Sequence, residues 1–166
     1  PEKCLVLILG AGGAARAIGV QLALSGAARV DIANRTVERA AKLAGFLSAE
    51  LNVASAAYGL ASLTPALTEQ YDLLVQTTSW GMAPHDDVPP LLDPEALHPH
   101  ALIADIVYTP QETSLLRAAR ERGCRTLEGL GMLVHQAALA HELWTGQKAP
   151  VAVMYTALKE QLARRR

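Results

Sequence analysis

The chain has 166 residues, of which 51% are hydrophobic, and this length fits one ordinary domain with a substantial apolar core. Its formal net charge is −1, so no basic excess points to a nucleic acid or another polyanion as a partner. Cys4 and Cys124 lie far apart and form no disulfide framework, and no apolar run approaches the length of a membrane span. We therefore expect a cytoplasmic protein.

The first predicted element is a buried strand at residues 5–9, which leads directly into a glycine-rich turn. Gly10, Gly12 and Ala15 have the spacing G-x-G-x-x-A, and a helix is expected over residues 14–24. Gly10 permits the tight turn, Gly12 lets the backbone approach a pyrophosphate, and the small Ala15 lets helix and strand pack closely. The free N–H groups at the helix start then face the phosphates. This turn predicts a dinucleotide site formed by Gly10, Ala11, Gly12, Gly13 and Ala14.

The second predicted strand, residues 29–33, indicates which coenzyme the site takes. NAD-binding folds normally place an acid at the end of this strand, where it accepts hydrogen bonds from ribose hydroxyls. Here Asn34, Arg35 and Thr36 follow the strand, and a planar guanidinium suits a phosphate dianion. Asp31 alternates with apolar neighbours inside the strand rather than lying at its end. We therefore expect NADP as cofactor, held by Asn34, Arg35, Thr36 and Arg39; the alternative is that both arginines are solvated charges at a helix start.

Apolar runs then continue to alternate with segments of helical periodicity. We expect a helix at 37–47, strands at 53–58, 71–76 and 102–107, a short turn at 60–67, a helix at 113–122 and a short strand at 125–127. Five of the nine prolines lie within residues 84–100, which predicts a stiff surface loop without a regular element. Its histidines, His85, His98 and His100, match no known metal-site spacing, so we expect them to be solvated and no metal to bind. The alternation predicts an α/β fold, a Rossmann-type doubly wound, mostly parallel six-stranded sheet with helices on both faces.

Two loops follow strands that end beside the predicted coenzyme. Thr77, Thr78 and Ser79 offer hydroxyls and backbone N–H groups to the pyrophosphate and the nicotinamide ribose, unless they form only a polar turn. Tyr108 follows the fifth strand, where its ring can wall the cofactor and its hydroxyl can reach a substrate. A half-buried aromatic at a strand end is the structural alternative.

A helix after residue 129 has an apolar stripe that one amide interrupts. Met132, Gln136, Leu139 and Leu143 share a face at spacings of four, three and four residues. A buried amide needs hydrogen-bond partners. Gln136 is therefore either a satisfied core glutamine or a substrate-binding amide.

These segments, in this order and spacing, resemble the shikimate dehydrogenase family. The resemblance rests on GAGGA at 10–14, NRTVER at 34–39, TTS at 77–79 with GM at 81–82, DIVY at 105–108 with Pro110, GLGMLV at 129–134 with QA at 136–137, and WTG at 144–146. It covers nearly the whole chain and implies an enzyme that uses NADPH to reduce 3-dehydroshikimate to shikimate in aromatic amino-acid biosynthesis. By the same resemblance Ile106, Gly129 and Met132 lie on the nicotinamide side, while Tyr108 and Gln136 reach the substrate.

The resemblance also implies that part of the machinery lies in another domain. In the family, a lysine and an aspartate of an amino-terminal substrate domain move the proton, and this chain begins at the first strand of the cofactor domain. We find no replacement for that pair, because a tyrosine hydroxyl, with an ordinary pKa of about 10, is a poor acid without a partner. We therefore expect residues 1–150 to form an NADP-binding domain without catalytic residues, inactive by itself.

The end of the chain has a pattern that suits a domain contact. Residues 151–166 are expected to form a helix that packs on the absent substrate domain, with Val153, Leu158 and Leu162 as its seam and a solvated end at residues 164–166. Without that domain, an exposed apolar patch would promote self-association.

Two other functions stay open. One is a stand-alone NADP-binding regulatory module, which the missing acid–base pair favours. The other is the cofactor half of a different NADP enzyme such as glutamyl-tRNA reductase, against which segments 129–136 and 144–146 and the lack of a basic surface for tRNA argue. Quinate is also open as a second substrate.

Overall fold

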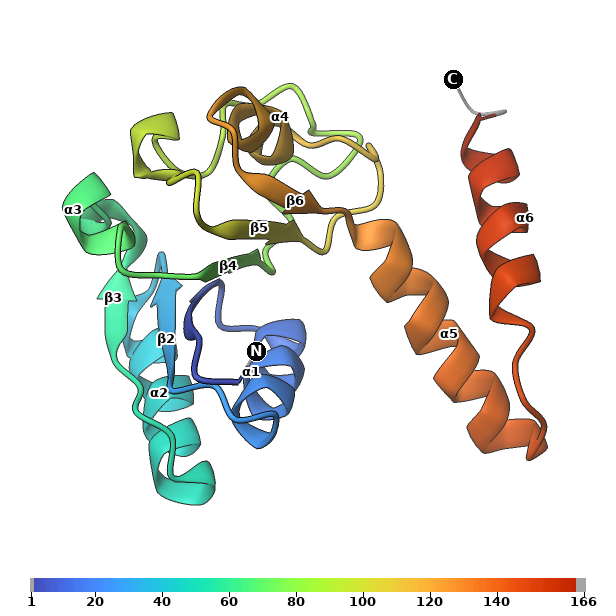
Figure 1. Cartoon of the computed structure of the whole chain (residues 1–166), viewed down its shortest axis with the longest axis horizontal. Coiled ribbons are helices and arrows are strands. Elements are labelled where there is room, and N and C mark those ends of the chain that lie inside the picture. Colours follow the sequence, from blue (N-terminus) through green and yellow to red (C-terminus); the bar gives the residue numbers. More distant parts are fainter. Residues whose placement is uncertain (1, 164–166) are drawn as a thin grey trace.

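Six parallel strands form one sheet in the computed structural model, which describes residues 2–163 (Figure 1). The strands are β1 (Leu5–Leu9), β2 (Arg29–Asn34), β3 (Ala57–Gly59), β4 (Leu73–Gln76), β5 (Leu102–Asp105) and β6 (Arg125–Leu127). Their order in the sheet is β3-β2-β1-β4-β5-β6, and every neighbouring pair is parallel. This confirms the predicted Rossmann-type fold. The order reverses between β1 and β4, so their carboxyl ends form the switch point where such sheets bind ligands.

Alternation along the strands divides the core into two layers. Val6, Ile8 and Ile32 face one way and pack with residues of α1 (Gly13–Leu24) and α2 (Val37–Leu51). Leu7 and Leu9 face the other way, toward the layer that contains α3 (Pro65–Thr68) and α4 (Ser114–Glu121). Successive side chains of a strand point to opposite faces, and both faces here are covered, so the strands read as continuous apolar runs.

The third strand is shorter than predicted. Residues 54–56 run beside β2, but only Ala54 forms an isolated bridge there, to Arg29. Side chains replace part of the ladder, because the Ser55 hydroxyl donates to the Val30 carbonyl and the Ala56 N–H donates to the Asp31 carboxylate at 2.7 Å. The regular strand therefore begins only at residue 57.

The proline-rich segment contains one helical turn, so the prediction that it lacks any regular element is wrong. A 3-10 turn, η2 (Pro94–Ala96), begins at Pro94, and the Asp93 carboxylate accepts from the Glu95 N–H at 2.9 Å. Proline is tolerated at the first position of a helix because the N–H that it lacks would have no partner there. A second short turn, η1 (Leu60–Ser62), follows β3.

The last two helices form an arm beside the sheet. Helix α5 (Gly129–Thr145) runs away from the end of β6, and α6 (Val151–Ala163) returns alongside it (Figure 1). Leu158 and Leu162 are half-buried, whereas Val153 is 66% exposed, so only part of the predicted seam is covered. The predicted solvated end at residues 164–166 lies outside the described residues. None of the helices described is both long and apolar enough to cross a membrane.

Candidate dinucleotide-binding site

A cleft of about 730 Å³ opens where β1, β2 and β4 end. Its size lies within the usual range of small-molecule sites. Many of the predicted residues come together here because parallel strands deliver their carboxyl ends to one edge of the sheet. Those that line the cleft are Gly10, Ala11, Gly12, Asn34, Arg35, Arg39, Thr77, Thr78 and Ser79.

Gly10 and Gly12 of the glycine turn are required for two different reasons. Gly10 has a φ of +114°, and a Cβ there would lie 2.5 Å from Thr77 Oγ1, so both backbone and packing require glycine. Gly12 lies before the first residue of α1, and a Cβ on it would meet no protein atom within 4 Å. Glycine at that position therefore has no packing reason within the protein and suits a ligand that approaches the backbone. The first turn of α1 has no acidic residue and no side-chain cap, which leaves its positive end open to an anion.

A second depression of about 390 Å³ lies beside the same turn. Three cationic residues border it, Arg16, Arg39 and Lys42, together with Gly13. The Arg16 guanidinium lies 3.8 Å from the centre of the Phe46 ring, a cation–π contact that orients it. Because Arg39 borders both hollows, positive charge surrounds the start of α1. The sequence interpretation missed Arg16 and Lys42, although their positions on the first turn of one helix and beside Arg39 on the next were a usable signal.

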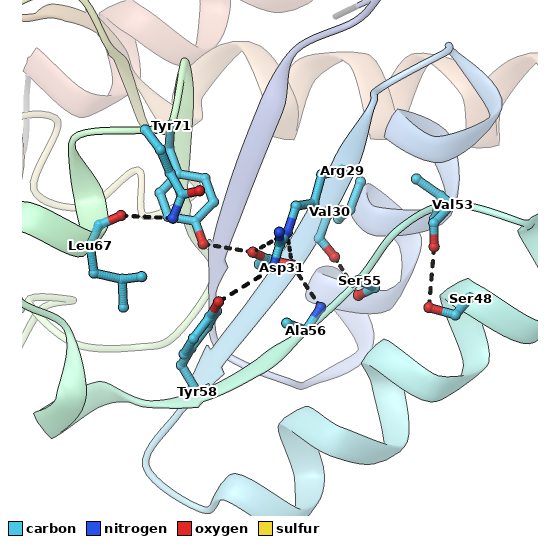
Figure 2. Close-up of polar contacts among 11 residues, drawn as sticks. Arg29, Val30, Asp31, Ser48, Val53, Ser55, Ala56, Tyr58, Leu67 and Tyr71 are labelled. Carbon is cyan, nitrogen blue, oxygen red and sulfur yellow. Dashed lines mark hydrogen bonds and ion pairs between the residues drawn. The ribbon is translucent and has the colours of Figure 1, made fainter.

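Asp31 is unavailable to a nucleotide (Figure 2). It is fully buried and accepts hydrogen bonds from Arg29 Nε at 2.7 and 2.9 Å, from the Tyr71 hydroxyl at 2.6 Å and from the Ala56 N–H at 2.7 Å. Burial and the adjacent carboxylate raise the pKa of the Tyr71 hydroxyl far above its ordinary value, so it stays a donor. The residues that line the cleft include two arginines and neither Asp nor Glu. The position of Asp31 inside the strand is as predicted.

The segment after β4 forms a larger wall than the sequence suggested. Besides residues 77–79, the cleft is lined by Trp80, Gly81, Met82, Ala83, Pro84, His85, Val88 and Leu91, with Leu60 from the opposite side. The Trp80 indole N–H donates to the Pro89 carbonyl at 2.8 Å, which folds the segment back on itself. His85 was expected to be a solvated loop residue; it is exposed, but it also borders the cleft.

The residues assigned to the nicotinamide and substrate side lie outside this cleft. Gly129 starts α5 against the end of β5, and a Cβ on it would lie 2.5 Å from the Ile106 carbonyl carbon and from the Val107 carbonyl oxygen. Tyr108 is 36% exposed. Gln136 is exposed, which excludes the buried core glutamine. Met132, like Ile106, is half-buried.

Ala14 and Thr36 were also predicted to bind the coenzyme, but they do not line the cleft. Ala14 lies exposed on the first turn of α1. Thr36 lies before the first residue of α2, and its carbonyl accepts from the Asn34 amide at 2.9 Å, so Asn34 shapes the turn. Within residues 2–163, no three His, Cys, Asp or Glu side chains gather as metal ligands.

Comparisons with known proteins match this architecture. Residues 2–106 match the family described as shikimate / quinate 5-dehydrogenase, and residues 129–159 match the shikimate 5'-dehydrogenase C-terminal domain. A protein named shikimate dehydrogenase (NADP(+)) from Methanopyrus kandleri is 46% identical over 163 residues, which are 98% of this chain and 56% of that protein. The chain thus spans about half the length of the curated relatives that it matches.

Solved structures agree with the sequence comparison. A shikimate dehydrogenase in complex with NADP+ has a TM-score of 0.88 and 35% identity, over 98% of this chain and 56% of that one. A ligand-free 5-ketofructose reductase of Gluconobacter has a TM-score of 0.85 and 37% identity, over 96% of this chain and 57% of that one. From the family match and the relatives together, we conclude that this chain belongs to the shikimate dehydrogenase family.

Proposed function

We propose that this chain is the NADP-binding part of a shikimate dehydrogenase-like oxidoreductase that reduces 3-dehydroshikimate to shikimate. The observation that carries the proposal is the charge of the cleft, which has Arg35 and Arg39 in its lining and no carboxylate. Asp31, the acid that could favour an unphosphorylated ribose, is buried and fully hydrogen-bonded. A cytoplasmic location and a role in aromatic amino-acid biosynthesis go with this proposal.

Different segments of the chain bind different parts of the coenzyme. The glycine turn, residues 10–14, and the start of α1 hold the pyrophosphate. Residues 34–36 and Arg39 hold the 2'-phosphate, because a guanidinium can donate two parallel hydrogen bonds to a phosphate. Residues 77–79 hold the pyrophosphate and the nicotinamide ribose. When bound, NADPH supplies the hydride for a ketone.

The nicotinamide and substrate contacts come from the segments that follow β5 and β6, at the same carboxyl edge of the sheet. Ile106, Gly129 and Met132 lie against the nicotinamide, while Tyr108 and Gln136 donate hydrogen bonds to the substrate. Support for this assignment comes from the exposure of Tyr108 and Gln136, which leaves both side chains accessible.

The proton must come from outside these residues. A ketone that receives a hydride becomes an alkoxide and needs an acid with a tuned pKa. We assign that acid to the part of the relatives that this chain does not match, which is nearly half of their length. The chain then binds NADP but does not catalyse unaided.

The outer face of α5 fits a contact with that other part. Leu139, Leu143 and Trp144 are 68%, 83% and 82% exposed, which is unusual for large apolar side chains on one helix. We assign residues 1–150 to the NADP-binding domain and α6 to the same contact surface.

Arg35→Ala tests the coenzyme assignment. The loss of a charge-assisted contact to the 2'-phosphate should weaken NADPH binding by about 10- to 100-fold. Binding of NADH, which has no such phosphate, should change little. Calorimetric titration of both coenzymes measures the ratio, and Arg117→Ala, at a 62% exposed arginine of α4, is the matched control. Equal losses for both coenzymes would refute the assignment.

A stand-alone NADP-binding regulatory module is the second candidate, and the absence of an acid–base pair in the described cleft favours it. The separately produced amino-terminal part of a shikimate dehydrogenase distinguishes the two functions. Added to this chain, it should restore NADP-dependent oxidation of shikimate if the chain is half of an enzyme. No activity from a mixture that forms a complex and binds NADP would favour the module.

A further inference from the structure

Three buried polar side chains connect the two loops that leave β4 and β5. Gln76 ends β4, Asp105 ends β5, and Thr113 precedes α4; their exposed fractions are 1%, 2% and 2%. None of the three lines the cleft. We propose that Gln76 and Asp105 are positioning residues that hold the loop 77–80 in its coenzyme-binding conformation and tie it to the segment 106–108, an inference that rests on the proposed NADP function.

The side-chain amide of Gln76 hydrogen-bonds the backbone of the loop 77–80. Its Oε1 accepts a hydrogen bond from the Thr78 N–H, and its Nε2 donates to the carbonyls of Thr78 and Trp80, each at 3.2 Å. The reverse orientation of the amide would set its oxygen against two carbonyl oxygens, so the network fixes which way it points. One side chain therefore holds backbone groups of two residues in the loop.

Asp105 connects this hydrogen-bond network to the segment that follows β5. Its Oδ1 accepts from the Val107 N–H at 2.9 Å and from Gln76 Nε2 at 3.4 Å. Its Oδ2 accepts from the Thr113 hydroxyl at 2.8 Å, and that hydroxyl in turn accepts from the Leu116 N–H at the start of α4. The carboxylate thus links the coenzyme loop, the backbone that leads to Tyr108 and the amino end of α4.

The loop cannot shift without disturbing the glycine turn. A Cβ on Gly10 would lie 2.5 Å from Thr77 Oγ1 and 3.1 Å from Thr78 Cγ2, so turn and loop are in close contact. Thr77 also hydrogen-bonds the Leu9 carbonyl through its N–H and its hydroxyl, both at 2.8 Å. A change at Gln76 therefore reaches the part of the cleft assigned to the pyrophosphate and the nicotinamide ribose.

Gln76→Leu, which keeps the approximate volume and removes every hydrogen bond, tests the inference on this chain. We expect its affinity for NADP to fall about tenfold or more, since all three side-chain hydrogen bonds to the loop are lost. Adenosine 2'-monophosphate has the 2'-phosphate but neither the pyrophosphate nor the nicotinamide ribose, so its affinity should change little. Calorimetry well below the melting temperature gives the ratio of the two affinities, which a purely structural role of Gln76 would leave unchanged.

Tyr71→Phe is the matched control, because it breaks a hydrogen bond of an equally buried network that does not touch the loop. It should lower the melting temperature and leave the ratio as in the wild type. If Gln76→Leu does not fold, Gln76→Met carries the test with the same expected loss of NADP affinity, because its unbranched side chain has a similar length and likewise lacks the amide. An unchanged ratio in the folded variant would overturn the inference. A wild-type chain that binds neither nucleotide would instead overturn the proposed function, and this inference with it.

Discussion

Four hydrogen bonds converge on the buried carboxylate of Asp31, and one of them can be removed with almost no change in shape. Tyr71→Phe deletes only the hydroxyl, which donates to Asp31 Oδ2 at 2.6 Å. A buried charge that loses a donor costs stability, so we expect the free energy of unfolding to fall by about 1–3 kcal/mol. Urea unfolding measures the change, with Tyr155→Phe on α6, outside the sheet, as control. A variant as stable as the wild type would show that the hydroxyl contributes nothing to the network.

Asp105 should make stability depend on pH. Burial raises the pKa of this carboxyl above 3.8, and the hydrogen bonds from Val107, Thr113 and Gln76 offset only part of the rise. The folded state therefore holds the proton more tightly than the unfolded state. Its contribution is fully present below the unfolded pKa and is lost as the pH rises through the folded pKa.

Asp105→Asn removes this titration. From about pH 4 upward, the wild type should therefore lose stability relative to the variant, until the folded pKa is passed. Urea unfolding of both proteins over a pH series gives the difference in free energy at each pH. A difference that stays constant across this range would contradict the raised pKa.

At the scale of elements, the contact between β5 and α5 depends on one glycine. Gly129→Ala would place a methyl group against the backbone of Ile106 and Val107, which cannot move aside like a flexible side chain. Such overpacking typically costs about 1–3 kcal/mol, and α5 has to shift outward. Gly131→Ala, in the same helix with open space around its Cβ, should instead be neutral or stabilising by up to about 1 kcal/mol. Thermal melts of the two variants that coincide would contradict this prediction.

Element positions were largely predictable because buried parallel strands are short apolar runs and helices have their own period. The strand at 5–9 and the strand at 125–127 agree with the structure residue for residue. The third strand begins later than predicted, because hydrogen bonds from Ser55 and to Asp31 replace part of the ladder, and no local pattern encodes them. The turn at Pro94 was missed because proline excludes a helix interior but not a helix start.

At the largest scale, helix α5 projects beside the sheet (Figure 1). Its large apolar side chains Leu139, Leu143 and Trp144 are exposed. Exposed apolar surface of this kind promotes association. Replacing Leu139 and Leu143 by glutamine should therefore lower any concentration-dependent association of the chain in sedimentation velocity. Leu24→Gln, at a residue as exposed as Leu139 but on α1, should leave it unchanged. Equal effects of both changes would show that the α5 face has no special role.

The sheet, the glycine turn and the arginine that replaces an acid after β2 could all be predicted from the residues alone, because they follow from local periodicity and from residue types at fixed spacing. Three features became evident from the fold alone: the Asp31 carboxylate is hydrogen-bonded by Arg29 and Tyr71, residues 80–85 with Val88 and Leu91 line the cleft, and Gln76 and Asp105 join two loops. Apart from the contact between Arg29 and Asp31, these contacts join residues far apart in the chain, and which polar groups meet depends on strand order and register. No local pattern records that choice.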